Sequence, residues 1–586
     1  MPVYLLQQAE RRTEYQEDIE KKKQELYAEI DSLPIQIKVK TPVNHVKKFL
    51  TDREVWSLTE MDYELQISYE QYLRKKLKPD KIMWYLGIYD VIKQQHIYQQ
   101  MQTLTGKRFY EWRYQNKVFY LKYYPDQQIA CDFKYIKDLR VLVWDFKKNC
   151  SEILKRQIFS TLSRIVAKTS ESIAYRNNRL KALKILYDSC VQQNIRDIGL
   201  LEIRQIQTIS KDFADTKNKT LMRHLGIIDE CRKDAFIQQE RIQWDATVWY
   251  IEKFHLDKSR INESSSLKSI SFMEIREWQN RKILQEYMKY ELGVTGQAVS
   301  TIRNRFIFIR NFLEMLEQEN ILAVDAKAEH LEQYAKSLRE RKIQAKSFNE
   351  RIFGIGHFFK FMEVRKYIPQ MPFRIEYFQQ KVITVHHDRS VEETVYMEIL
   401  KKLYLFPERL RCMFLHLWCL GLRASEVCTL KGNAYCQQGK DYWIQVYQVK
   451  MKNYKKIPIP KALYQLMKVY LKKYDIQSDE YIFKNAKGDG ACLYQTFRDQ
   501  MLKACRENKI ANGEYIFKSH DYRHTVATMF YDNDVSLQSI RDYLGHTYEE
   551  MTRQYIDYMP KKIAQANEEF FSMQESSLAS WLKKGE

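Results

Sequence analysis

The segment SHDYRHTVATMF at residues 519–530 places His520 and Arg523 three positions apart in a helical pattern. Side chains at this spacing lie on one face of a helix, so the imidazole and the guanidinium are expected to point the same way. The pair by itself says little, because the chain has 12 His and 96 Lys and Arg residues. Its meaning depends on three other segments in the last third of the chain.

Two of these segments come before it. LGLRASEV at 420–427 sets Arg423 and Glu426 on one helical face. IQVYQVKMKNYKKIPIP at 444–460 alternates β-branched and polar residues around a polar middle, which predicts a hairpin with Lys452 near its turn.

The last segment, DYLGHTYEEMTRQYIDYMP at 542–560, has His546 and, nine residues later, Tyr555. Each residue has an ordinary structural explanation: His546 as a hydrogen-bonded core histidine, Tyr555 as one of 41 tyrosines anchoring a helix. Together, however, the four segments contain the residue types needed to bind and cleave a phosphodiester. Two guanidiniums can bind the non-bridging oxygens of a phosphodiester, and histidines can hydrogen-bond them. A lysine can protonate a leaving hydroxyl, and a tyrosine can attack phosphorus.

The ordered set closely resembles the tyrosine recombinase (phage integrase) family over residues 270–570 or so. Residue by residue, the resemblance implies a catalytic set of Arg423, Lys452, His520, Arg523, His546 and Tyr555. Family hairpins place the lysine eight residues before the proline that ends the second strand, and Pro460 points to Lys452. Lys450, Lys455 and Lys456 are the other lysines of the hairpin, and Lys455 and Lys456 stay open as alternatives. Tyr558 is the rival nucleophile.

The resemblance implies DNA strand exchange without a cofactor or a metal. Tyr555 would form a 3′-phosphotyrosyl bond and release a 5′-hydroxyl, and a tetramer on two synapsed double-stranded sites would exchange strands through a Holliday junction. Glu426 is expected to orient an arginine or histidine rather than act as a base. Two other hypotheses are a catalytically silent DNA-binding regulator or assembly factor with the same fold, and a relaxing topoisomerase that shares the phosphotyrosine step.

Composition agrees with a nucleic-acid partner. The 586 residues carry a formal net charge of +21, which favours a polyanionic ligand. Only 16 Gly and 11 Pro occur, which favours long helices over turn-rich β structure.

The ten cysteines form no CxxC pair and no metal-ligand cluster, as is typical of a reducing cytosol. The most apolar stretch, at 413–422, is too short to span a membrane, and no signal peptide is recognised at the start. We therefore expect a cytoplasmic protein, associated with the nucleoid when bound to DNA, and no membrane partner.

The expected fold class is mainly α with small β-sheets (α+β). A helix-rich N-terminal region would be followed by a helical core DNA-binding domain and a mixed α/β catalytic domain. The expected boundaries are 1–265 for the N-terminal region, 270–373 for the helical domain, 374–390 for a linker, 391–560 for the catalytic domain and 561–586 for a tail exchanged between subunits or packed on its own domain.

Within 270–373, apolar residues recur at helical spacing and basic residues lie opposite them. The apolar set is Ile309, Phe312, Leu313, Leu316, Ile352, Ile355, Phe358, Phe359 and Met362. The basic set, expected to meet DNA phosphates, is Arg303, Arg305, Arg310, Arg339, Arg341, Lys342 and Lys346. A merely solvated basic face is the alternative.

The N-terminal region is the least informative part. Residues 1–30 predict a charged, solvated helix, 108–135 a strand pair, and 257–268 a linker. Residues 179–195 match 305–321 in length and apolar spacing, which indicates either an internal duplication or shared helical periodicity. The size of the region resembles that of recombinase-type transposases, in which added modules bind element ends, other recombinases or accessory proteins of the same element.

Overall fold

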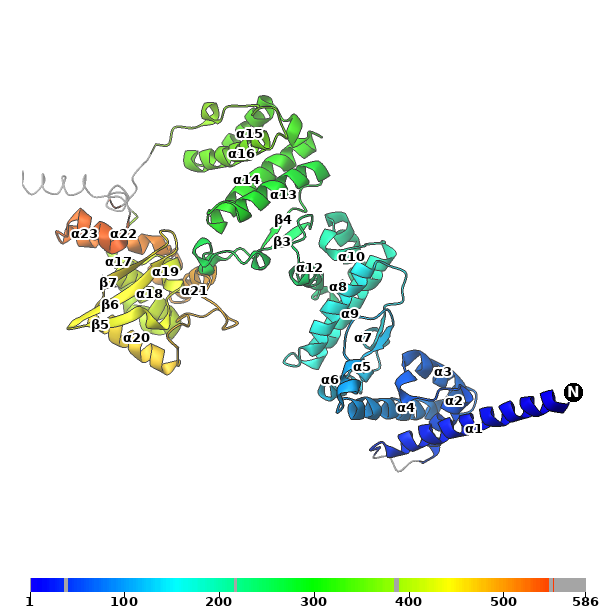
Figure 1. The fold of residues 1–586 in the computed structure, drawn as a ribbon. Helices are drawn as coiled ribbons and strands as arrows, with labels where there is room; N and C mark the ends of the chain where they lie inside the picture. Colours follow the sequence, from blue (N-terminus) through cyan, green and yellow to red (C-terminus); the bar gives the residue numbers. More distant parts are fainter. Residues whose placement is uncertain (1, 36–39, 216–218, 384–388, 547–551, 553–586) are drawn as a thin grey trace, which may run out of the picture. The chain divides into compact units, whose positions relative to one another are not determined.

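The computed structural model describes residues 2–35, 40–215, 219–383, 389–546 and 552, and it divides into two compact units (Figure 1). The first unit comprises 1–253 with 271–274, and the second comprises 254–270 with 275–586. Helices dominate both units, and the strands form small sheets. The expected α+β class is confirmed.

The first unit opens with five helices, of which the first four pack around a core that includes Leu26, Phe49, Tyr69 and Tyr89. The charged helix expected at the start is present and runs from residue 2 to residue 32. The five helices are α1 (Pro2–Ser32), α2 (Lys40–Asp52), α3 (Tyr63–Arg74), α4 (Pro79–Gln100) and α5 (Leu104–Phe109).

The rest of this unit has a second core, centred on the buried Trp144 and Tyr187. Strand β1 (Val118–Tyr120) pairs antiparallel with β2 (Val143–Asp145). The other elements are α6 (Gln127–Phe133), α7 (Leu139–Leu142), α8 (Glu152–Ala167), α9 (Ile173–Gln192), α10 (Ile203–Asp215), α11 (Lys219–Met222), α12 (Ile227–Gln238) and β3 (Val248–Tyr250).

The strand pair predicted within 108–135 is wrong in its second half. Only the first strand lies in that window, and residues 127–133 form a helix. The partner strand is 143–145, because Trp144 and Phe146 bring that segment into the same core as Phe119. Alternation along a sequence indicates a strand but does not identify its partner.

The segment predicted as a linker at 257–268 is held in place rather than free. Two short 3₁₀ turns at Lys258–Arg260 and Glu263–Ser265 each have a side-chain cap, from Asp257 and Asn262. Arg260 donates hydrogen bonds to the carbonyl oxygens of Glu291, Leu292 and Gln297. A polar, serine-rich sequence predicts a loop correctly, but these contacts could not be read from it.

After β4 (Ser269–Ser271), four helices lie within the expected helical region 270–373: α13 (Trp278–Gly293), α14 (Val299–Gln318), α15 (Ala328–Glu340) and α16 (Ala345–Val364). Every apolar residue predicted to face its core is buried. The assignment of that face from helical spacing is confirmed.

The C-terminal domain mixes helices with one three-stranded sheet. Its elements are α17 (Glu393–Lys402), α18 (Glu408–Leu420), α19 (Ala424–Cys428), β5 (Tyr435–Gln438), β6 (Asp441–Gln448), β7 (Asn453–Pro458), α20 (Lys461–Lys473), α21 (Tyr494–Glu507), α22 (Ser519–Asp532) and α23 (Leu537–Leu544).

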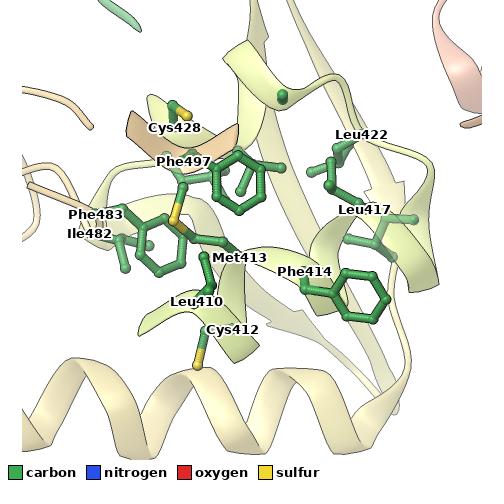
Figure 2. Packing of buried hydrophobic residues seen from close by; sticks show 14 of the residues in the cluster. Leu410, Cys412, Met413, Phe414, Leu417, Leu422, Cys428, Ile482, Phe483 and Phe497 are labelled. Carbon is green, nitrogen blue, oxygen red and sulfur yellow. The ribbon is translucent and has the colours of Figure 1, made fainter. Parts of the chain in front are cut away.

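Helix α18 is the centre of this domain's core (Figure 2). Its Leu410, Met413 and Leu417 lie among residues from distant segments, such as Phe483 and Phe497. Phe414 meets Tyr522 of α22 edge to face, with ring centroids 5.1 Å apart. The MFLHLWCLGL stretch is therefore a buried core helix, as its length and composition predict.

The predicted hairpin is present, and its register decides which lysine points inward. In the antiparallel pairing of β6 and β7, Ile444 is opposite Ile457 and Val446 is opposite Lys455. Ile444, Val446, Lys455 and Ile457 are all buried, whereas Lys456 is exposed. Because side chains alternate between the two faces of a strand, Lys455 belongs to the buried face.

Among the described helices, none is both long and apolar enough to cross a lipid bilayer.

Candidate active site

The site begins where α18 ends and α19 starts. Gly421 stops α18 in a left-handed conformation, with φ of 57°, and Arg423 is the residue just before α19. One turn into α19, the buried carboxylate of Glu426 accepts hydrogen bonds from the Arg423 backbone N–H at 3.0 Å and from its Nη1 at 2.8 Å. Glu426 thus fixes both the backbone and the side chain of Arg423, the orienting role expected from the sequence.

Arg523 comes into the same site from α22, where it is fully buried. Its Nη1 donates to the carbonyl oxygen of Gly421 at 2.9 Å, and its Nη2 donates to that of Leu544 at 2.6 Å. Both carbonyls lie at helix C-termini, where the helix dipole favours a cation. The two helix ends therefore hold the guanidinium in one orientation.

His546 directly follows the end of α23. Its Nε2 lies 2.9 Å from Nη2 of Arg523, and its Nδ1 lies 3.0 Å from Oγ1 of Thr552. Since a guanidinium only donates, Nε2 must be the acceptor and the proton sits on Nδ1. Burial and the neighbouring cations, Arg523 first, lower the pKa of His546 to about 2, so the ring is neutral.

Lys455 completes the charged group. Its Nζ lies 3.6 Å from Glu426 and 3.4 Å from the carbonyl oxygen of Leu544. Burial lowers the pKa of Lys455 to about 8, although the Glu426 carboxylate works in the opposite direction. Burial alone would raise the pKa of Glu426, but nearby cations, Lys455 first among them, hold it below its ordinary value.

Lys452 lies elsewhere. It sits at the hairpin turn with φ of 55°, and its Nζ is 3.4 Å from the carbonyl oxygen of Gly296. The structure therefore brings Lys455 into contact with the site and leaves Lys452 on the turn beside it. Lys456 is on the opposite face of β7, with its amino group 5.5 Å from the centre of the Trp443 ring.

His520 is at the start of α22 and is exposed. Desolvation by its neighbours, together with the charges of His524, Arg523 and Arg423, lowers the pKa of His520 to about 4. The expected arrangement of His520 and Arg523 on one helix is present. Tyr555, the rival Tyr558 and the tail at 561–586 lie outside the described residues.

Three features of the site were not found from the sequence. The buried amide of Gln448 lies 3.4 Å from Glu426 and from the carbonyl oxygens of Leu544 and Gly545. Gly545 has φ of 71°, and a Cβ there would collide with the Gln448 side chain. Thr552 Oγ1 accepts a hydrogen bond from Nδ1 of His546. Of these three residues, only Gly545 could have been recognised from the sequence, because a glycine in Leu-Gly-His is typical of a helix end.

The predicted DNA-contacting residues divide into two groups. Arg303, Arg339, Arg341, Lys342 and Lys346 are exposed. Arg305 instead forms an ion pair with the buried carboxylate of Glu291, at 3.0 Å, and Arg310 lies 3.4 Å from Glu314. Helical spacing placed these two arginines on the polar side but could not show that acidic partners hold them.

In total, three cations, Arg423, Arg523 and Lys455, surround one carboxylate. The excess positive charge is partly buried, so it favours an anion that brings its own charge and hydrogen-bond acceptors. A phosphodiester has both. The geometry thus supports the binding of a phosphate group.

Residues 389–562 match the model of the phage integrase family. This domain is therefore similar to the tyrosine recombinases of that family. Among curated proteins, transposase B from transposon Tn554 of Staphylococcus aureus is 28% identical over 323 residues, covering 53% of this chain and 51% of that protein. Tyrosine recombinase XerC of Anoxybacillus flavithermus is 21% identical over 279 residues, covering 46% of this chain and 90% of that protein. The chain therefore spans about half the length of the staphylococcal relatives it matches.

Two solved structures are also similar to about half of this chain. XerH site-specific recombinase bound to a difH substrate has a TM-score of 0.40 and 15% identity, and it covers 51% of this chain and 90% of its own. The Tn1549 transposon integrase in complex with a circular intermediate DNA has a TM-score of 0.37 and 16% identity, and it covers 49% of this chain and 98% of its own.

Proposed function

We propose that this chain is a site-specific DNA recombinase that cuts and rejoins double-stranded DNA through a 3′-phosphotyrosyl intermediate. The observation that carries the proposal is the convergence of Arg423, Arg523 and Lys455 around the buried Glu426. An anchored group of cations is what a scissile phosphate requires as negative charge builds up on its oxygens.

The proposed nucleophile is Tyr555. Its spacing from Thr552 in the sequence supports this choice over Tyr558. Thr552, which accepts a hydrogen bond from His546, precedes Tyr555 by three residues and Tyr558 by six. In the proposed step, the tyrosine oxygen forms a bond to phosphorus while the bond from phosphorus to the 5′-oxygen breaks. The tyrosine proton goes to solvent or a basic group, and the leaving oxygen takes up a proton. A tyrosine needs an electropositive site to react at neutral pH, because its ordinary pKa is about 10.

The proposed donor of that second proton is Lys452, with Lys455 as a fixed charge. Lys455 is buried and held by Glu426 and Leu544, so it is placed to stabilise charge. Lys452 is on the exposed turn, where its long side chain can reach a leaving group without breaking a buried ion pair. Lys455 remains the alternative acid, since a pKa of about 8 also suits proton donation near neutral pH.

The reaction would integrate or excise a mobile element. This part of the proposal rests on the relatives named as transposases of Tn554 and on the sequence outside the recombinase domain. A tetramer on paired sites and accessory proteins of the same element are the proposed partners. The exposed residues Arg303, Arg339, Arg341, Lys342 and Lys346 are the proposed phosphate contacts of the helical domain.

The decisive experiment is covalent trapping on a nicked duplex that carries the core site, followed by denaturing gel electrophoresis. The parent protein should form a protein–DNA adduct, and Tyr555→Phe should form none while binding DNA within severalfold of the parent. Tyr558→Phe is the matched control and should form the adduct normally. If the parent forms no adduct but binds the site tightly, the protein is a DNA-binding regulator instead. Relaxation of supercoiled DNA without joint molecules from two duplexes would indicate a topoisomerase.

A further inference from the structure

The first unit contains a second copy of the start of the helical domain. Helices α8 and α13 both have 16 residues, α9 and α14 both have 20, and α10 and α15 both have 13. A three-residue strand precedes each set, β2 in one case and β4 in the other. Between α9 and α10, and between α14 and α15, lies one short 3₁₀ turn, at Ile198–Leu200 and Ala323–Asp325.

The buried faces of α9 and α14 coincide over most of their length, although Ile173 is exposed and its equivalent Val299 is buried. When α9 is aligned with α14 from their first residues, Leu183 corresponds to Ile309, Leu186 to Phe312 and Cys190 to Leu316. All six side chains are fully buried. Shared helical periodicity alone would explain this agreement inside one helix, but not equal lengths in three successive helices.

The helix ends also agree. Asn194 and Asn320, at matching positions after α9 and α14, have φ of 53° and 59°. In each copy, the next residue's backbone N–H donates back to a carbonyl of the last helical turn, from Ile195 to Cys190 and from Ile321 to Leu316, both at 2.9 Å. Asparagine tolerates this left-handed conformation better than most residues. The match between 179–195 and 305–321 is therefore part of a longer internal duplication.

Basic residues recur at equivalent positions of the two copies. Arg156 in α8 corresponds to Lys282 in α13, and Lys211 in α10 corresponds to Lys336 in α15. All four are exposed. Two less exposed arginines also correspond, Arg179 in α9 and Arg305 in α14. Arg179 forms an ion pair with Glu171, and Arg305 forms one with Glu291. The two copies thus share these basic positions, whereas Arg303 and Arg339 of the second copy correspond to Asn177 and Ala214 in the first.

We propose that residues 118–215 form a second DNA-binding module, which contacts the phosphates of duplex DNA through exposed basic residues of α8 and α10. The inference rests on the proposed function, under which the helical domain at 270–373 binds DNA. Exposed cations shared by both copies favour binding to a polyanion, and the chain's net charge of +21 also favours such a partner. The protein would then hold duplex DNA beyond the segment bound by the helical and recombinase domains.

The test measures how the affinity of the full-length protein for duplex DNA depends on salt and on duplex length. The first-copy variant is Arg156→Glu with Lys211→Glu, and the matched second-copy variant is Lys282→Glu with Lys336→Glu. Lys75→Glu with Lys78→Glu makes the same charge change at exposed positions outside both copies. Each phosphate that a variant no longer neutralises should reduce the slope of log affinity against log salt by about 0.9.

We expect the first-copy variant to reduce that slope by about 0.9 to 1.8, which corresponds to one or two phosphates. It should also fail to show the gain in affinity that the parent shows on longer duplexes, while it still forms the tyrosine adduct on a short nicked core site. A first-copy variant that behaves like the Lys75/Lys78 control in both measurements would overturn the proposal, and so would a change in self-association or protein binding with DNA affinity unchanged.

Absence of adducts in the parent would refute the proposed recombinase function, while the salt and length measurements would still decide on the second module. Circular dichroism of each variant checks that the helices remain folded.

Discussion

Nη2 of Arg523 lies 2.9 Å from Nε2 of His546, so the arginine donates to a neutral imidazole whose own proton faces Thr552. Arg523 lies in α22, whereas His546 follows the end of α23, 23 positions later. Through this contact, the orientation of the guanidinium and the tautomer of the histidine determine each other. An entering phosphate therefore meets a preset arrangement rather than two independent side chains.

This contact predicts that Arg523→Lys will be inactive although it keeps the charge. A lysine cannot bond to Gly421, Leu544 and His546 together in the planar geometry of a guanidinium. Adduct formation should fall by about 10²–10³-fold, the usual effect of removing one preorganised donor. The control is Arg541→Lys, at a partly exposed arginine of α23 paired with Asp542, which should react normally. Activity of Arg523→Lys within threefold of the parent would contradict the assigned role.

The two hairpin lysines should respond differently to a substrate with sulfur at the bridging 5′ position. Lys452→Ala is expected to slow cleavage of the natural substrate by about 10²–10⁴-fold, typical for loss of a general acid. Sulfur should restore its rate, because a thiolate leaves without a proton. Lys455→Ala should remain slow on both substrates, since Glu426 loses a positive neighbour.

Lys456→Ala is the matched control for these lysine variants, because its side chain is on the opposite face of β7. It should cleave both substrates normally. The reverse result, with sulfur rescuing Lys455→Ala and not Lys452→Ala, would transfer the role of general acid to Lys455.

Gly545→Ala should disrupt the site more than an equivalent change elsewhere. Gly545 and Gly439 both have positive φ, of 71° and 61°, so alanine at either is strained by about 1 kcal/mol. Only at Gly545 would the added methyl group also collide with Gln448, whereas the space around Gly439 is open. Gly439→Ala should therefore retain cleavage, and Gly545→Ala should lose both stability and cleavage. If Gly545→Ala and Gly439→Ala lowered the melting temperature and adduct formation equally, the Gln448 contact would be unimportant.

The buried His546 should make the end of the recombinase domain sensitive to acid. Its pKa is lowered to about 2 in the folded state, against about 6.5 in an unfolded chain, so the unfolded state binds more protons below pH 6.5. Stability from this group is complete above pH 6.5 and is lost as the pH falls. The loss between pH 6.5 and 5 should be about 2 kcal/mol.

Hydrogen exchange in α22 and α23 at pH 6.5 and 5, corrected for the intrinsic exchange rate, measures this loss locally. His546→Gln, which can still accept from Arg523 but does not titrate in this range, should remove it. An unchanged pH dependence in that variant would mean that other groups cause the sensitivity.

Sequence patterns alone identified much of this molecule. Helical spacing gave the buried face of α14 and α16, and strand alternation gave the hairpin around Lys452. The order of Arg423, His520, Arg523 and His546 along the chain resembles that of the tyrosine recombinase family. These are local properties, in which the identity and spacing of neighbouring residues determine the outcome.

Other features depended on residues far apart in the chain. The partner of β1 is set by the core that Trp144 joins, and the inward position of Lys455 is set by its pairing with Val446. The carbonyl oxygen of Leu544 gathers donors from Gln448, Lys455 and Arg523, which come from two strands and a helix. The proposed duplication rests on equal helix lengths and matching helix ends taken together, which the sequence alone does not give.

Sequence determined which segments form helices and strands and which residue types could do phosphate chemistry. Only the tertiary structure decided which of those charges meet, because packing and strand register, rather than spacing along the chain, bring distant side chains within hydrogen-bonding distance.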